Sequence, residues 1–156
     1  MSVLSIFTQI EASGIGKAIR ASLWLFPVIE ACHLLALAVI GGSVLIVDLR
    51  LFGLGITNEP VSELWRDAQP WFAGSLIVML ISGLLLFTSE ATKLYYHGAF
   101  WFKMSCLFLS MLFAFTIRRR VAKAANVPPL WSKLVAFVSV LLWAGVGVGG
   151  RWIGFS

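Results

Sequence analysis

Four apolar segments, each close to the length needed to cross a lipid bilayer, constrain this chain more than any other feature. They cover residues 25–49, 71–88, 100–117 and 134–150. About 20 residues of helix cross the ~30 Å hydrocarbon core of a bilayer, and a helix satisfies its backbone polar groups internally. With 60% hydrophobic and 12% charged residues, the chain is far more apolar than soluble domains, in which about a quarter of residues are charged. We therefore predict an integral membrane protein.

The connections between the four segments are short and polar, which favours helices that run alternately up and down. The predicted fold is all-α: one membrane domain, residues 1–156, that forms a four-transmembrane-helix up-down bundle. Residues 1–20 place apolar side chains at helical spacing between polar ones. This pattern predicts a short N-terminal amphipathic helix, either on the membrane surface or packed against the bundle.

The basic residues indicate how the chain is oriented in the membrane. Seven of the 12 Lys and Arg residues flank the first and third connections, and five of these lie within residues 118–133. Because cytoplasmic loops carry an excess of Lys and Arg, we expect a multi-pass protein of the bacterial cytoplasmic (inner) membrane with both termini in the periplasm. The basic run adjoins an apolar segment instead of following a polar face, which argues against nucleic-acid binding.

Ionisable residues near the outer ends of the spans are the candidates for a functional site, because charged groups inside a bilayer are costly. Glu30 and His33 are three residues apart, so a helix places them on one face. His33 lies ~9 Å below the outer boundary. Lys103 and Arg151 approach the same level from the third and fourth spans. We expect Glu30 to pair with one of the other three groups; for Lys103 and Arg151, snorkelling to the headgroups is the alternative.

The inner end of the first span carries a second pair of charges. Asp48 and Arg50 are at positions i and i+2 and do not face each other on a helix. Each is therefore expected to pair elsewhere, with Arg66, Asp67 or the arginine run at 118–120 as candidates. Helix-end charges that only fix the topology are the alternative.

A b-type haem is the cofactor that this residue set favours. One imidazole can hold the iron, so His33 is the expected metal ligand, and Lys103 and Arg151 are expected to meet the propionates. Met104 and His97 are the candidates for a sixth ligand, with an open position as the alternative. The residue count places His97 ~9 Å above the level of His33.

The fourth span contains the sequence GVGVGG, in which Gly145 and Gly149 are four residues apart. Such small residues either make room for a cofactor or permit close helix packing, within the chain or in an oligomer. Copper has less support than haem: soft sulfur ligands select Cu(I), but no Met-rich or Cys-x-x-Cys spacing occurs. A di-iron site is disfavoured because Glu-x-x-His occurs once.

Three stretches resemble an uncharacterised family of small bacterial four-helix membrane proteins. They are HLLALAVIGGSVLIVDLRLFGL (33–54), FWFKM (100–104) and GRWIGF (150–155). More distantly, the histidine followed by Gly-Gly and an end containing Asp and Arg is similar to copper-resistance D-type membrane proteins and to the haem-associated membrane protoporphyrinogen oxidase of bacteria. The last resemblance implies haem at His33 and places that family's downstream arginine at Arg50.

The expected function is a membrane-embedded redox or electron-transfer protein whose partners are the lipid bilayer and a redox protein or larger membrane complex. A non-catalytic accessory or structural subunit, or a homo-oligomer, is the alternative. A small transporter is the third interpretation, disfavoured because the sequence shows no internal repeat or broken helix. No catalytic triad, phosphate loop or pair of catalytic carboxylates is present, so the sequence assigns no enzymatic reaction.

Overall fold

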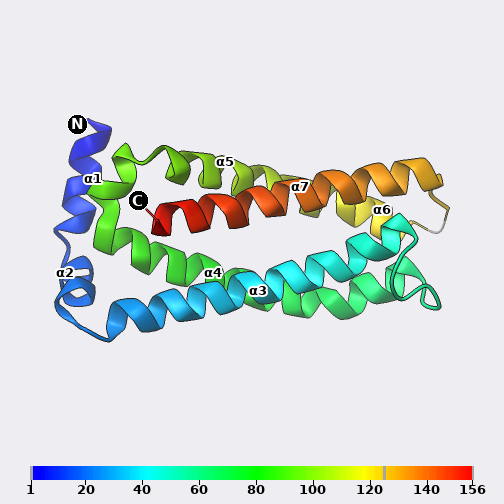
Figure 1. The fold of residues 1–156 in the computed structure, drawn as a ribbon, viewed down its shortest axis with the longest axis horizontal. Coiled ribbons are helices and arrows are strands. Elements are labelled where there is room, and N and C mark those ends of the chain that lie inside the picture. The colour runs from blue at the N-terminus through cyan, green and yellow to red at the C-terminus, as the bar shows by residue number, and fades with distance from the viewer. Residues whose placement is uncertain (1, 125, 156) are drawn as a thin grey trace.

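Four long helices, all long and apolar enough to cross a membrane, form the body of the computed structural model, which describes residues 2–124 and 126–155. They are α3 (Leu25–Phe52), α4 (Val61–Tyr96), a third span over Gly98–Lys123 and α7 (Pro129–Gly154). Successive spans run in opposite directions, and the described ends of the chain lie at the same end of the bundle (Figure 1). The predicted all-α up-down bundle is therefore confirmed.

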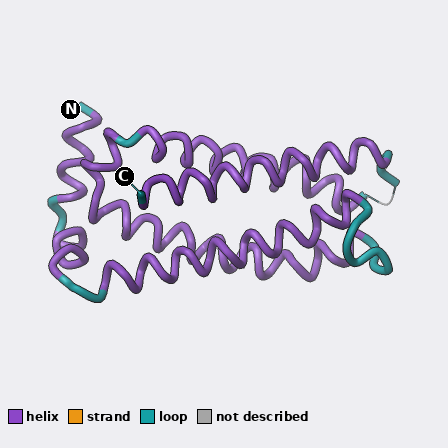
Figure 2. The backbone as a smooth tube through the Cα atoms, in the orientation of Figure 1, coloured by secondary structure: helices purple, strands orange, loops and turns teal. Residues whose placement is uncertain are grey.

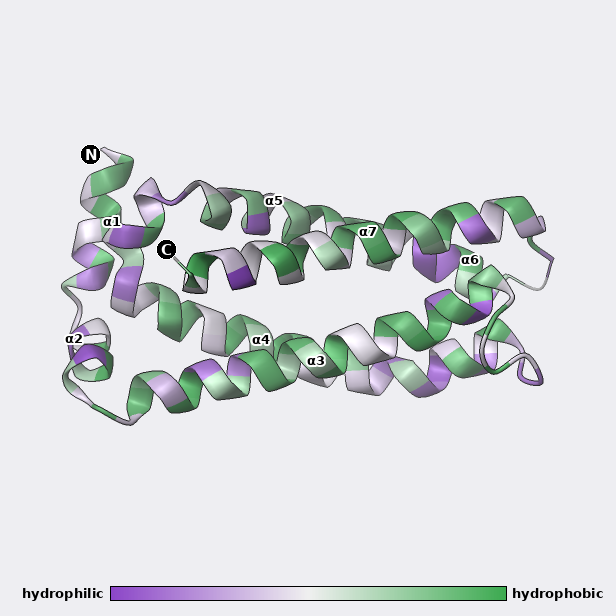
Figure 3. Ribbon diagram, viewed as in Figure 1, coloured by the Kyte–Doolittle hydropathy of each residue, from purple (hydrophilic) through white to green (hydrophobic). Residues whose placement is uncertain are grey.

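The spans extend beyond the predicted segments, most of all in α4. This helix begins ten residues before the predicted 71–88 and ends at Tyr96. The third span continues to Lys123 and the fourth covers Pro129–Gly154. The added turns are rich in polar residues (Figure 3). A hydropathy pattern identifies only the apolar part of a helix, so the predicted segments were shorter than the helices. The end of α3 is set by Gly53, whose φ of +85° permits the left-handed turn that caps the helix.

The third span contains a change of helical pitch near its inner end. It consists of α5 (Gly98–Phe113), a π-helical segment η1 (Ala114–Arg118) and α6 (Arg119–Lys123). A π-helical turn is wider than an α-helical one and therefore shifts the faces of the residues that follow. Arg118, at the end of η1, is buried.

The four spans form two closely packed pairs, α3 with α4 and α5 with α7, which meet through α3 and α7. Figure 2 shows the pairs converging toward the end opposite the termini and lying apart at the termini. The core between them contains Ile40, Val44, Phe72 and Trp143. Phe72 and Trp143 meet edge to face with 5.8 Å between ring centroids, a favourable aromatic geometry.

The glycines of α7 serve the packing of α7 on α5. A Cβ added at Gly145 would lie 2.8 Å from Sγ of Cys106, and one at Gly149 would lie 3.0 Å from Cβ of Lys103. Gly147 lies between them and has nothing within 4 Å of an added Cβ. The close-packing alternative for the glycine stripe therefore holds within the chain, because small residues let the two backbones approach.

The N-terminal segment forms two helices instead of the single amphipathic helix predicted over residues 1–20. They are α1 (Val3–Glu11) and α2 (Gly14–Ala21). The hydroxyl of Ser13 accepts a hydrogen bond from the N–H of Gly16 at 3.2 Å, an N-cap that begins the second helix. Both helices pack on α4, so the alternative of packing against the bundle is the one observed (Figure 1).

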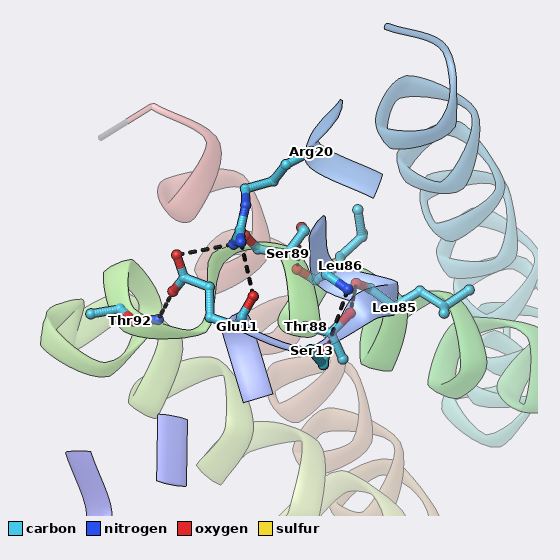
Figure 4. A network of polar contacts seen from close by, with 9 residues as sticks. Glu11, Ser13, Arg20, Leu85, Leu86, Thr88, Ser89 and Thr92 are labelled. Carbon is cyan, nitrogen blue, oxygen red and sulfur yellow. Dashed lines mark hydrogen bonds and ion pairs between the residues drawn. The ribbon is translucent and has the colours of Figure 1, made fainter. Parts of the chain in front are cut away.

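Figure 4 shows how α1 and α2 attach to a kink in α4. Glu90 has non-helical dihedral angles there (φ −133°, ψ 29°). Two residues later, the N–H of Thr92 donates to Oε2 of Glu11 at 2.6 Å, and Arg20 donates to the carbonyl of Ser89 at 2.6 Å. Arg20 also pairs with Oε1 of Glu11 at 3.0 Å. The hydrogen bonds from Thr92 and the charge of Arg20 lower the pKa of Glu11.

Candidate functional site

The predicted histidine lies buried between α3 and α4. His33 is 9% exposed, and its Nδ1 lies 2.9 Å from the hydroxyl oxygen of Ser82. The same hydroxyl lies within hydrogen-bond distance of the carbonyls of Val78 (2.7 Å) and Met79 (3.2 Å). When it donates to one of these, it accepts from Nδ1 of His33, and that tautomer of the ring has its lone pair on Nε2.

Two further residues define the surroundings of the imidazole. A Cβ added at Gly83 would lie 3.1 Å from Cε1 of His33, so the absence of a side chain gives the ring its space. Lys103 of α5 is half-buried, and its stem crosses Gly149 and Gly150 of α7. Its charge is near enough to interact electrostatically with His33. No ion pair or hydrogen bond of the Lys103 ammonium occurs within residues 2–124 and 126–155.

The expected pairing of Glu30 is wrong. Its side chain is exposed, and it forms no ion pair or hydrogen bond in the described part of the chain. The buried face of α3 passes through His33, Ala36 and Ile40, and a spacing of three residues leaves Glu30 rotated by about 60° from His33. At this end α3 also lies apart from α7 (Figure 1), so no helix covers the rotated position.

The remaining predicted residues do not gather around His33. Arg151 is exposed and places its guanidinium 4.7 Å from the ring centre of Phe155. Met104 is 39% exposed. His97 forms the junction of α4 and α5. Ser82, which marks the level of His33, is about four helical turns or roughly 20 Å from His97 along α4. His97 and His33 therefore cannot bind the same iron.

The donor set near His33 suits a cofactor that needs one protein ligand. Within the described residues, no group of three or more His, Cys, Asp and Glu side chains is placed to hold a metal ion. A bare copper or di-iron centre requires several such ligands. Haem requires only an axial one, because the porphyrin supplies four nitrogens. His33 offers one imidazole, and the charge of Lys103 lies near it.

A second polar site lies near the opposite end of the bundle. The Nε of Arg118 donates to Oδ1 of Asp48 at 2.8 Å, and its Nη2 donates to the carbonyl of Val44 at 3.0 Å. Arg118 is 5% exposed and Asp48 is 0% exposed. Among the candidate partners of Asp48, the arginine run at 118–120 is the one that the structure shows. Arg50 instead donates to the carbonyl of Glu59 at 2.8 Å.

Two buried serines contribute to these sites without any signal in the sequence. Ser82 orients His33, and Ser139 of α7 lies beside Asp48. In the described residues, neither the hydroxyl of Ser139 nor Oδ2 of Asp48 has a hydrogen-bond partner of normal geometry. Serines in apolar helices commonly bond to their own backbone, so their spacing alone did not distinguish these two from Ser75 or Ser110.

The fold and these sites define a four-span membrane protein with an imidazole held near one end of the bundle and a buried ion pair near the other. Residues 8–156 match DUF6644, a family of unknown function, and the chain belongs to that family. Neither the curated proteins nor the solved structures gave a match.

Proposed function

We propose that this protein binds one b-type haem through Nε2 of His33 and acts in electron transfer within the membrane. The supporting observation is the hydrogen bond between His33 and Ser82. Metal-binding histidines usually donate their other ring nitrogen to a nearby oxygen, which fixes the tautomer and the ring orientation. The oxygen that faces Nδ1 of His33 is the hydroxyl of Ser82, and the lone pair of Nε2 is then available to the iron. The distant similarity of this histidine to that of the haem-associated oxidase points the same way.

Each residue near the imidazole has a distinct part in this proposal. Ser82 holds the proton on Nδ1 and prevents rotation of the ring. Gly83 leaves space at the ring edge. Lys103 offers a positive charge for a propionate, and its apolar stem is already ordered against α7. Haem supplies one-electron chemistry when bound, and its potential depends on the axial ligand and on burial.

Visible spectroscopy of the purified protein tests this proposal. The protein is expressed with added haem precursor, purified in detergent and assayed for a Soret band and for haem content per chain. We expect one haem in the wild type, loss of haem in His33→Ala, and unchanged content in the matched control His97→Ala. Ser82→Ala is expected to retain haem with weaker binding, because the ring loses its orienting hydrogen bond. A colourless wild type, or equal haem in His33→Ala, refutes the proposal.

A subunit of a larger membrane complex, or a homo-oligomer, is the second candidate. Glu30 and Gly41 are both exposed and lie about three turns apart on one outward face of α3. A carboxylate facing hydrocarbon is costly, and glycine permits a second helix to approach closely. Crosslinking at Cys32, which is exposed on the same helix, tests this: a specific crosslinked product in native membranes supports the assembly, and its absence argues against it.

The proposed location is the bacterial cytoplasmic membrane with both termini in the periplasm. The basic stretch around α6 lies at the end opposite the termini (Figure 1), in agreement with the positive-inside rule. A periplasm-active reporter fused to the C-terminus is expected to be active. Activity of a cytoplasmic reporter at that position reverses the orientation and moves His33 to the inner leaflet.

A further inference from the structure

A pocket of about 210 Å³ lies where the first turns of α4 meet η1. It is lined by Trp65, Gln69, Phe72, Ala114, Phe115, Arg118 and Arg119. A water molecule occupies ~30 Å³ in the liquid, so the space accommodates a polar group of several heavy atoms. The lining combines aromatic rings with hydrogen-bond donors and includes no carboxylate.

Arg118 brings an unused donor to the wall of this pocket. Its Nε and Nη2 are bonded to Asp48 and to the carbonyl of Val44. No hydrogen bond in the described residues uses its Nη1. The side chain is 5% exposed and cannot swing into solvent, because the two bonds hold the guanidinium in place. Because Arg118 is one of the lining residues, its remaining N–H groups are the donors that it can offer to a ligand there.

The surroundings of the pocket are positively charged. Asp48 offsets the charge of Arg118, but Arg119 is exposed and forms no ion pair in the described residues. Lys123 adds a further cation, with its Nζ 4.7 Å from the ring centre of Trp65. Within the described residues, neither Arg119 nor Lys123 forms an ion pair, so an anion in the pocket would meet two unneutralised cations together with Arg118.

We propose that this pocket binds the phosphate of an anionic phospholipid headgroup. Arg119 lies about one turn before the end of the third span at Lys123, and the ends of a membrane-spanning helix reach the headgroup region of a bilayer. Phe115 and Leu112 are exposed on the same helix toward the hydrocarbon and provide an apolar surface for the acyl chains. Basic pockets between spans bind anionic headgroups in this way, and guanidinium groups match the geometry of phosphate oxygens.

Thermal unfolding of the full-length protein in a zwitterionic detergent tests the proposal. Phosphatidylglycerol, phosphatidylcholine or inorganic phosphate is added to separate samples. A ligand that binds only the folded state raises the melting temperature. We expect phosphatidylglycerol to raise it by several degrees, with little change from the other two. Arg119→Gln is expected to lose most of the shift. Arg120→Gln is the matched control, because it removes the same charge from the next, exposed residue, which does not line the pocket.

Native mass spectrometry of the same variants counts the bound lipids and does not depend on stability. We expect one retained phosphatidylglycerol in the wild type and in Arg120→Gln, and none in Arg119→Gln. Equal loss in both variants would show diffuse surface attraction and overturn the site. A shift of the same size with phosphatidylcholine would overturn the choice of an anionic ligand. The same shift with inorganic phosphate alone would overturn the assignment to a lipid.

Discussion

Replacement of Arg118 by methionine is expected to lower the free energy of unfolding by about 3–5 kcal/mol, the usual cost of removing one partner from a buried ion pair. The structure explains the size of the effect. Arg118 donates both to Asp48 and to the carbonyl of Val44, and hydrogen bonds to charged groups contribute about 1.5–3 kcal/mol each. Asp48 is 0% exposed, and within the described residues Oδ2 has no hydrogen-bond partner of normal geometry although Ser139 lies beside it. The substitution therefore removes the cation of this buried carboxylate and the donor to its Oδ1.

A double-mutant cycle separates the ion pair from loss of packing. The variants are Arg118→Met, Asp48→Leu and the double substitution, unfolded by denaturing detergent in zwitterionic micelles and followed by circular dichroism. Because the double variant leaves no isolated charge, it is expected to be less destabilised than the sum of the single variants. Additive effects would refute the reasoning. The control is Asp67→Asn, which breaks the exposed 3.7 Å pair with Arg66 and is expected to have no measurable effect.

Three further predictions concern the helix contacts. Gly149→Ala is expected to destabilise the protein by about 1–3 kcal/mol, because the added methyl group overpacks the contact with α5. Gly147→Ala is the control and should be neutral, because its added methyl group meets nothing within 4 Å. Equal unfolding curves for the two variants would contradict this prediction. Gly16→Ala is expected to detach α2, because its Cβ would collide with the Thr88 carbonyl; faster proteolysis at the N-terminus would reveal it. The pKa of Glu11 is lowered, so the stability that its carboxylate contributes is present above the ordinary carboxyl pKa and is lost as the pH falls through the lowered pKa. The melting temperatures of wild type and Glu11→Gln should therefore differ at pH 7, and the difference should shrink as the pH is lowered below the ordinary carboxyl range.

The number and direction of the spans were predictable because long apolar segments have few alternatives to crossing a membrane. The ends of the helices were not. Half of residues 61–70 of α4 are polar, and the segment includes Pro70, so its hydropathy resembles that of a loop. They are helical because Trp65 and Ala68 pack on the core at this end, a tertiary contact without a local signal. The break between α1 and α2 depends in the same way on their contacts with α4.

The parts of the candidate site that were predictable from the sequence are those indicated by a single unusual residue. His33 is unusual in an apolar helix, and its burial followed from that. The position of Glu30 depended on which helix faces it, and a spacing of three residues cannot decide this. For Asp48 the sequence narrowed the partners to a few groups, and the wide turn at η1 determined which arginine of the run at 118–120 points inward. No property of the sequence marked Ser82, since its function comes from lying opposite His33.

The distance in sequence between Asp48 and Arg118 has a consequence for biosynthesis. The two residues are 70 positions apart, and ribosomes add ~5–20 residues per second, so about 4–14 s pass between the synthesis of the acid and that of its partner. During this interval the carboxylate of Asp48 lacks the guanidinium with which it pairs in the folded protein. The end of α3 that carries Asp48 is therefore expected to stay at the level of the lipid headgroups. It should move to its final depth only when the third span arrives. Ribosome stalling between the two codons would leave the chain in that shallow state.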